Sequence, residues 1–325
     1  QHFANFGGED RFWLSPEGGP YSLWFKPGVE QVLANWYTPA ALNEGAWPVT
    51  SGADDPYYRM QQPMRLQNTA GTDFELDAPR DVRLLNEAAL AEVFGQQPAA
   101  QMTADDVKLV AYETVNTVTN RGPDMAKEKG LVSIWMLGML NSGPETVVVV
   151  PYKSGDPTQL GPVVKSDYFG QVPPDRLKVL PEAILFRADG EYRSKIGTSQ
   201  SRAKDVLGSI DFAAGVLTLV HFTMPEDPTG HYYMNNMWGE QDEPFEGDVA
   251  NSYNDGPPEP GKKGLGAFYE IESLSPAPVL KSGESLTHHH RTIHIQADLP
   301  TLNKLAVQVL GIELETVRKE MLSGE

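Results

Sequence analysis

Residues 266–296 read GAFYEIESLSPAPVLKSGESLTHHHRTIHIQ and contain two alternating runs that decide the fold class. In an extended strand, successive side chains point to opposite faces of the sheet. The first run therefore sets Glu270 and Glu272 on one face, and the second sets His288 and His290 on one face of its own strand. Because strands joined by a short Pro- and Gly-rich link commonly pair as neighbours, we predict that these carboxylates face these imidazoles.

The histidine run allows three interpretations. In the first, Glu270 or Glu272 accepts a proton and His288 or His290 donates one, as in acid–base catalysis. In the second, two or three of His288, His290 and His294 bind a metal ion together with a glutamate. In the third, the imidazoles lie on a solvated sheet face and take no part in any chemistry.

The same alternation recurs along most of the chain. Short β-branched or alternating runs predict a hairpin in residues 11–25 and strands in residues 81–85, 107–120, 131–140 and 146–152. In the histidine strand, Ile293 and Ile295 are expected to face the core. Helical periodicity is confined to residues 85–95 and to the C-terminus, where Asp298 suits a helix start and Gly311 a helix end. We predict one mainly β domain in residues 1–297 and a helical appendage in residues 298–325, packed as a lid on the sheet edge.

Composition excludes several classes of partner. The chain has 26 Lys and Arg against 44 Asp and Glu, a formal charge of −18, which would repel phosphate backbones and anionic lipid surfaces. No apolar stretch approaches the roughly 18 residues of a membrane span. Nucleotide-binding and nucleophile-elbow motifs are absent. We therefore expect neither nucleic acid nor membrane as a partner, and no cofactor beyond the metal ion considered above.

The sequence begins at Gln1 rather than at a methionine. We expect that a secretion signal has been removed before this start, which would give a periplasmic or extracellular location.

Residues 183–197, AILFRADGEYRSKIG, carry a local hairpin signal, because Asp189-Gly190 suits a two-residue type I′ turn. One interpretation is a surface hairpin with stabilising cross-strand pairs. In the other, a basic patch holds a carboxylate or sulfate of a substrate. Its members would be Arg187, Arg193, Lys195 and Arg202.

Further side chains are of the kinds that bind sugars. Tryptophan offers a flat apolar face, and of the six tryptophans we select Trp36. Arg59 and Arg65 can face one side of a strand, either toward a ligand or in ion pairs. Residues 247–266 are expected to form a long loop, where turn chemistry competes with a binding role. The other predicted substrate-binding residues are Arg187, Asn251, Asp255 and His294.

The stretches GGEDRFWLSPEGGPYSLWF, residues 7–25, and YEIESLSPAPVLKSGESLTHHHRTIHI, residues 269–295, resemble an uncharacterised family of secreted bacterial proteins. That family is similar to the aldose 1-epimerase, or galactose mutarotase, superfamily. The resemblance implies a large antiparallel β-supersandwich whose concave face binds a sugar. In active mutarotases a His protonates the ring oxygen and a Glu deprotonates the anomeric hydroxyl. The Asn-His-x-x-Phe-Asn motif of mutarotases is missing, so Glu270 or Glu272 with His288 or His290 would take these roles.

We therefore predict a carbohydrate-binding or carbohydrate-active protein, similar to an epimerase. One alternative is a non-catalytic sugar-binding module. The other is a cupin-like metal protein using the row from His288 to His294, because GESLTHHH resembles the cupin glycine followed by a His-x-His pair. The sequence makes no prediction of the oligomeric state.

Overall fold

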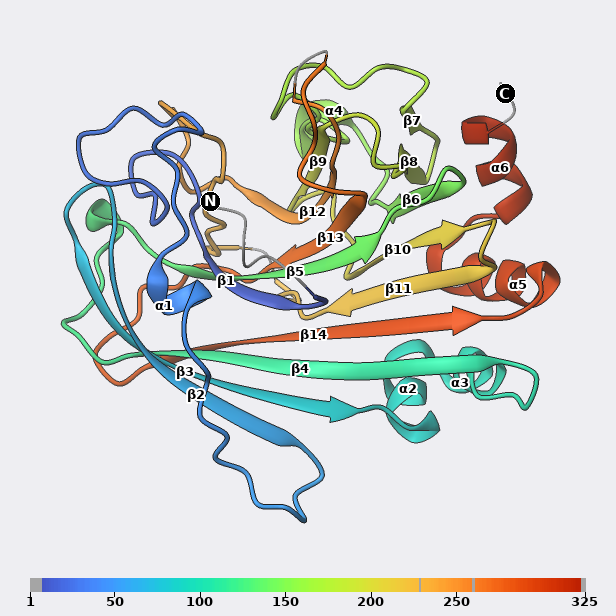
Figure 1. Cartoon of the computed structure of the whole chain (residues 1–325), viewed down its shortest axis with the longest axis horizontal. Coiled ribbons are helices and arrows are strands. Elements are labelled where there is room, and N and C mark those ends of the chain that lie inside the picture. Colours follow the sequence, from blue (N-terminus) through green and yellow to red (C-terminus); the bar gives the residue numbers. More distant parts are fainter. Residues whose placement is uncertain (1–7, 228, 259–260, 323–325) are drawn as a thin grey trace.

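The computed structural model describes residues 8–227, 229–258 and 261–322. In these residues, fourteen strands form two antiparallel sheets that pack face to face (Figure 1). The smaller sheet has the order β1-β5-β13-β12-β9 and the larger has the order β2-β3-β4-β14-β11-β10-β6-β8-β7. The predicted antiparallel β-supersandwich is confirmed.

The strands of the smaller sheet are β1 (Arg11–Ser15), β5 (Ser133–Asn141), β9 (Ser194–Ser199), β12 (Asp248–Asn254) and β13 (Phe268–Leu274). Those of the larger sheet are β2 (Tyr58–Gln67), β3 (Asp73–Leu84), β4 (Lys108–Asn120), β6 (Thr146–Pro151), β7 (Leu177–Val179), β8 (Ala183–Arg187), β10 (Val206–Asp211), β11 (Val216–Phe222) and β14 (Ser285–Gln296). The helices are α1 (Ala40–Asn43), α2 (Glu87–Phe94), α3 (Gln96–Met102), α4 (Pro157–Leu160), α5 (Leu299–Leu310) and α6 (Leu314–Leu322), with one 3-10 turn, η1 (Lys127–Lys129).

The main core fills the space between the sheets. In β1, Phe12 and Leu14 are buried in this core, which leaves Arg11 and Trp13 on the opposite face of the smaller sheet. The same alternation holds in β13, where the inward Tyr269 bonds through its hydroxyl to a serine of β10 in the larger sheet, 2.7 Å away. The smaller sheet thus has an apolar inner face and an outer face available for polar side chains.

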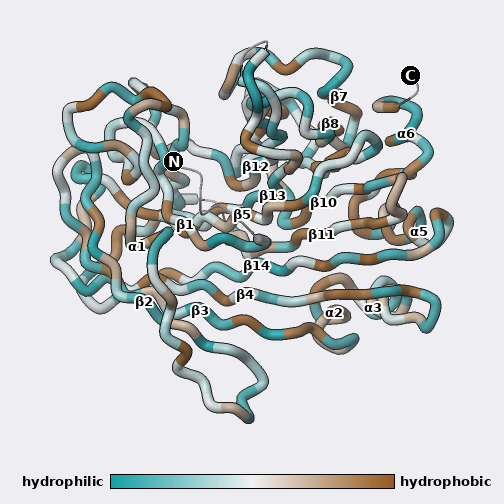
Figure 2. The backbone as a smooth tube through the Cα atoms, in the orientation of Figure 1, coloured by the Kyte–Doolittle hydropathy of each residue, from teal (hydrophilic) through white to brown (hydrophobic). Residues whose placement is uncertain are grey.

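Helices α2, α3, α5 and α6 cover one end of the outer face of the larger sheet and form a third layer there (Figure 1). A second apolar cluster joins α2, α3, α5 and α6 to the strands, and it contains Ile293 and Ile295 as predicted. Figure 2 shows apolar residues recurring along both the helices and the strands at this end. Asp298 caps α5 by accepting a hydrogen bond from the Thr301 amide, and Gly311 ends the helix at a φ of 74°. The appendage packs on the sheet face through inner strands, so the prediction of a lid on the sheet edge is wrong.

The two runs that opened the sequence analysis do not pair with each other. β13 lies in the smaller sheet between β5 and β12, whereas β14 lies in the larger sheet between β4 and β11. Residues 275–284 therefore cross from one sheet to the other. The predicted strands and their alternation are confirmed, but their predicted pairing is wrong.

Three local predictions also fail. In residues 11–25 only β1 is a strand, and Leu23, Trp24 and Phe25 belong to an irregular segment buried in the core. The turn at Asp189 and Gly190 joins β8 of the larger sheet to β9 of the smaller one, so it closes no hairpin. The first half of residues 247–266, predicted as loop, contains β12, whose seven residues are all buried.

No helix in the described part of the chain is long and apolar enough to cross a membrane.

Candidate functional site

A cavity of about 280 Å³ opens on the outer face of the smaller sheet. Its floor is formed by outward-facing residues from all five strands of that sheet. We call these side chains the pocket floor: Arg11, Trp13, Trp135, Leu137, Lys195, Tyr253 and Glu270. The walls come chiefly from loops and from α1, in residues 17–43, 168–169, 236–238, 255–258 and 263–265.

Strand register explains why these residues meet. Glu270 of β13 lies opposite Tyr253 of β12, which lies opposite Lys195 of β9, so the three side chains share one face. In the adjacent row, Leu137 lies opposite both Arg11 and Glu272. Residues that are far apart in the chain, from Arg11 to Glu272, therefore lie on one face of the five-stranded sheet.

The floor carries two ion pairs of different depth. Arg11 pairs with Glu270, and both side chains are partly accessible in the cavity. Beneath the floor, the fully buried Glu272 accepts a 2.9 Å bond from Lys195 Nζ and a 2.8 Å bond from Trp135 Nε1. Glu272 Oε1 has no hydrogen-bond partner among the described residues. A charged pair that is removed from water needs such bonds to offset the cost of desolvation.

Aromatic rings surround these charges. The rings of Trp13 and Trp135 meet edge to face with centroids 5.4 Å apart, and the Arg11 guanidinium lies 4.5 Å from the Trp13 ring centroid. Trp36 stacks on the buried Trp24 at 5.5 Å, with 13° between the ring planes. Trp238 completes a wall and packs edge-on against the core. The cavity thus combines flat apolar faces with carboxylates and cations.

Glu17 is a pocket carboxyl group that makes no ion pair with any described residue. Its Oε1 accepts a 3.0 Å bond from Trp36 Nε1. Burial raises the pKa of Glu17, the charge of Lys195 lowers it, and the negative charge of Glu272 raises it further, with a net increase. Glu17 is thus the pocket carboxyl group best placed to hold a proton.

The side wall at Tyr168 requires a glycine at position 197. Tyr168 bonds through its hydroxyl to Asp248 and lies 3.3 Å from Asn251 Nδ2. A Cβ at Gly197 would lie 2.1 Å from an Asp248 oxygen and 2.5 Å from Asn251 Nδ2. Any larger residue at position 197 would displace this group, and with it the tyrosine that lines the cavity.

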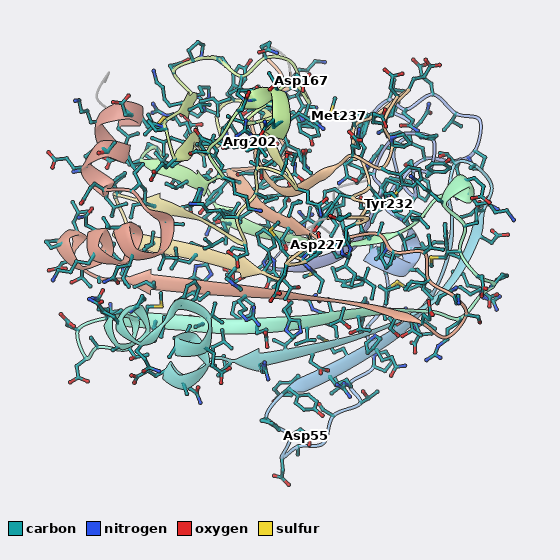
Figure 3. The ribbon with its side chains drawn as sticks, turned by 180° about the vertical axis from the view of Figure 1, so that it is seen from behind. Asp55, Asp167, Arg202, Asp227, Tyr232 and Met237 are labelled. Carbon is teal, nitrogen blue, oxygen red and sulfur yellow. The ribbon has the colours of Figure 1, made fainter. Side chains whose placement is uncertain are left out.

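Figure 3 shows where these walls lie in the molecule. Met237, a wall residue, and Asp167, the neighbour of Tyr168, are labelled in the loops at the upper part of this view. Asp55 marks the tip of the loop before β2, at the opposite end of the molecule.

The structure brings together only some of the residues selected from the sequence. Trp36, Asp255 and Glu270 line the cavity, and Glu272 and Asn251 lie beneath its floor. The other selected residues lie elsewhere: Arg59 pairs with Asp81, Arg65 with Glu75, Arg187 with Asp189, and His294 with Glu9. Of the predicted basic patch, Arg193 and Lys195 line the cavity, whereas Arg202 is fully buried among backbone carbonyls.

The histidines predicted to face the glutamates lie on the opposite side of the smaller sheet. His288 and His290 are fully buried between the sheets, and the Ser273 hydroxyl lies 2.8 Å from a ring nitrogen of each. His290 Nε2 is 3.2 Å from a carboxylate oxygen of the buried Asp10. Burial, followed by the charges of neighbouring residues, lowers the pKa of His288 well below its usual value. The predicted contact between these imidazoles and Glu270 or Glu272 is wrong, because Glu270 and Glu272 point outward from β13 while Ser273 points inward.

No group of three His, Cys, Asp or Glu side chains within the described ranges is arranged to hold a metal ion. His294 is separate from the other two, since its ring bonds to Glu9 and Thr218.

Sequence reasoning missed several pocket residues. Alternation in RFWLS already sets Arg11 and Trp13 on the face opposite Phe12 and Leu14, so these two could have been selected. Glu17 had no such signal, because an irregular loop places it in the cavity.

Residues 1–321 match the model of a family described as a family of unknown function, DUF6786. Among solved structures, the chain is similar to a putative aldose 1-epimerase from Escherichia coli K12, with 13% identity, a TM-score of 0.46, and coverage of 91% of this chain and 83% of that one. It is also similar to the protein Slr1438 from Synechocystis sp. PCC 6803, with 9% identity, a TM-score of 0.42, and coverage of 88% and 78%. A search among curated proteins finds no match. At these TM-scores the likeness says nothing about function, which has to come from the residues of the chain itself.

Proposed function

The chain belongs to the family of unknown function DUF6786, and we propose that it binds a carbohydrate in the cavity on the outer face of the smaller sheet. One observation carries the proposal: Trp13, Trp36 and Trp238 line the same cavity as Glu17 and Glu270. A sugar ring has apolar C–H faces that pack on indole rings and a rim of hydroxyl groups that bond to carboxylates and cations.

The proposal is tested by titrating the protein with mono- and oligosaccharides in a calorimeter, first with the unaltered chain and then with Trp238→Ala. Trp238 and Trp47 are both partly buried tryptophans packed against the main core, but only Trp238 lines the cavity. We expect Trp238→Ala to weaken binding at least tenfold, a loss of about 1.4 kcal/mol, because it removes one apolar face. Trp47→Ala is the matched control and should leave the affinity within about twofold. Equal losses in both variants, or no heat from any saccharide, would refute the proposal.

Glu17 favours a second candidate function, proton transfer at the anomeric centre of the bound sugar. Two pocket carboxyl groups differ in environment, since Glu17 lacks a cationic partner among the described residues whereas Glu270 pairs with Arg11. Environments that separate the pKa values of two carboxyl groups suit one as acid and the other as base. In this assignment Glu17 protonates the ring oxygen and Glu270 accepts the proton of the anomeric hydroxyl.

Anomer exchange measured by NMR near neutral pH tests this second candidate. Glu17→Gln keeps an oxygen to accept the Trp36 bond but has no proton to donate as an acid, so we expect a rate loss of about a hundredfold or more. The control is Glu75→Gln, which alters an ion pair on the β2–β3 hairpin outside this cavity. Binding without faster exchange than in buffer would favour the non-catalytic sugar-binding module.

A further inference from the structure

Two cations of the cavity, Arg193 and Lys263, form no ion pair with any residue in the described ranges. Arg193 lies directly before β9, two residues from Lys195, and both side chains line the cavity. Lys195 is neutralised by Glu272. In contrast, no carboxylate among the described residues lies within ion-pair distance of Arg193 or of Lys263 on the cavity rim. Two cations without an ion pair to these residues stand out in a chain whose formal charge is −18.

The Arg193 guanidinium is held in place by other means. It lies 4.0 Å from the centroid of the Phe169 ring, and its Nε donates a 3.3 Å bond to the Tyr253 hydroxyl. Tyr253 is fixed in turn, because it donates a 2.7 Å bond to Asp255. The two terminal nitrogens, Nη1 and Nη2, make no hydrogen bond to the described residues and are not among the buried unpaired atoms. Arg193 therefore offers two parallel N–H donors from a fixed plane.

A fixed guanidinium with both terminal nitrogens available matches the two oxygens of a carboxylate, or two oxygens of a sulfate or phosphate, as a paired donor set. Simple hydroxyl recognition does not need this arrangement, since neutral donors and the ion-paired floor already supply hydrogen bonds. We propose that the carbohydrate is acidic and that Arg193 binds its anionic substituent. This inference rests on the proposed function of carbohydrate binding. Lys263 adds a second positive charge at the rim.

The test compares matched saccharides that differ only in charge. Affinities are measured by calorimetry for the methyl glycosides of galactose, glucose and their uronates, and for the 6-sulfates and 6-phosphates of the two neutral sugars. We expect one anionic class to bind at least tenfold more tightly than its neutral counterpart, and this preference to fall as the salt concentration rises. The three anionic arms identify which substituent the site accepts.

Variants of Arg193 test whether this residue causes the preference for anionic sugars. Arg193→Gln should abolish the preference for the anionic sugar while keeping the affinity for the neutral sugar within about threefold, and Arg193→Lys should restore only part of the preference, because it keeps the charge and loses the paired donors. Arg59→Gln, on the exposed side of β2, is the control and should change neither affinity. Thermal unfolding of each variant verifies that it is folded.

These measurements distinguish failure of the acidic-ligand proposal from failure of the proposed carbohydrate binding. Equal binding of neutral and anionic sugars to the unaltered protein would overturn the acidic-ligand proposal and leave carbohydrate binding intact. A preference that survives Arg193→Gln would equally overturn the role of Arg193. Failure of every saccharide to bind would overturn both proposals together.

Discussion

Outside the cavity, Glu113 of β4 is a buried carboxylate that is surrounded by basic side chains. Its buried carboxylate lies 2.9 Å from His289 Nδ1 and 2.7 Å from Arg291 Nη2, and it also pairs with Arg83. Burial alone would raise the pKa of Glu113. The His289 hydrogen bond and the charges of Arg291, His289 and Arg83 outweigh burial and lower the pKa to about 2.

A lowered carboxylate pKa stabilises the folded state at neutral pH. Because the folded protein binds the proton less tightly than the unfolded chain, this stabilisation is complete above about pH 5 and is lost as the pH falls toward 2. We expect Glu113→Gln to lower the free energy of unfolding by about 3 kcal/mol at pH 7 and to have much less effect at pH 2 to 3. Urea unfolding at several pH values measures this. A variant whose loss in stability is the same at pH 7 and pH 2.5 would contradict the assignment.

At the scale of single residues, the sequence predicted side-chain direction better than side-chain partners. Glu270 and Glu272 do share a face, as do His288 and His290, because alternation along a strand is a local property. Which group lies opposite each face depends on residues far away in the chain. The buried Asp10, which pairs with His290, is 280 positions from it and had no signal in the sequence.

Among the elements, the loop around α4 is held by one buried cation. Arg202 is fully buried, and its guanidinium donates to the carbonyl oxygens of Lys153, Gly155 and Gly161. The segment it binds leads into Tyr168, which lines the cavity. Figure 3 labels Arg202 beneath this upper loop region. This arginine therefore links the stability of the fold to the shape of a cavity wall.

Replacing Arg202 with methionine keeps a flexible, unbranched side chain, although a shorter one, and removes all of these donors. Since hydrogen bonds from charged groups each contribute about 1.5–3 kcal/mol, we expect a loss of about 3 kcal/mol or more and faster proteolysis between residues 153 and 161. Denaturant unfolding and limited proteolysis measure the two effects. Arg318→Met, which alters an exposed pair with Glu145, is the control and should cost less than about 1 kcal/mol. Unchanged proteolysis in Arg202→Met would show that the loop is held by other contacts.

In β14, the predicted alternation is confirmed, and the burial of its residues was predicted only in part. Its even-numbered residues from Leu286 to Thr292 are buried between the sheets, while its odd-numbered Ile293 and Ile295 are buried beneath the helices. Side chains on the two faces of β14 therefore pack into two different cores. Periodicity alone does not reveal this change, because it arises where the helical layer begins to cover the outer face.

For the whole molecule, the mainly β sandwich and the C-terminal helices were predictable, and the assignment of strands to sheets was not. Neighbours such as β2, β3 and β4 follow one another along the chain, whereas β1 pairs with β5 and β5 pairs with β13. Such pairings across long stretches of chain have no local signature. Because the candidate site lies on the sheet built mainly from such pairings, the sequence supplied single pocket residues but not the set that they form together: Trp36, Arg193, Lys195, Asp255 and Glu270.

The most direct test of the binding site is a crystal structure of the protein with the saccharide that binds most tightly in calorimetry. The structure predicts that the sugar lies on the outer face of the smaller sheet, with one ring face against Trp238 or Trp13 and hydroxyl groups near Glu17 and Glu270. It also predicts that the anionic substituent lies at Arg193. A sugar bound instead between Arg65 and Arg121, in the second cavity beside β2, or against the helical layer would contradict the assignment of the site.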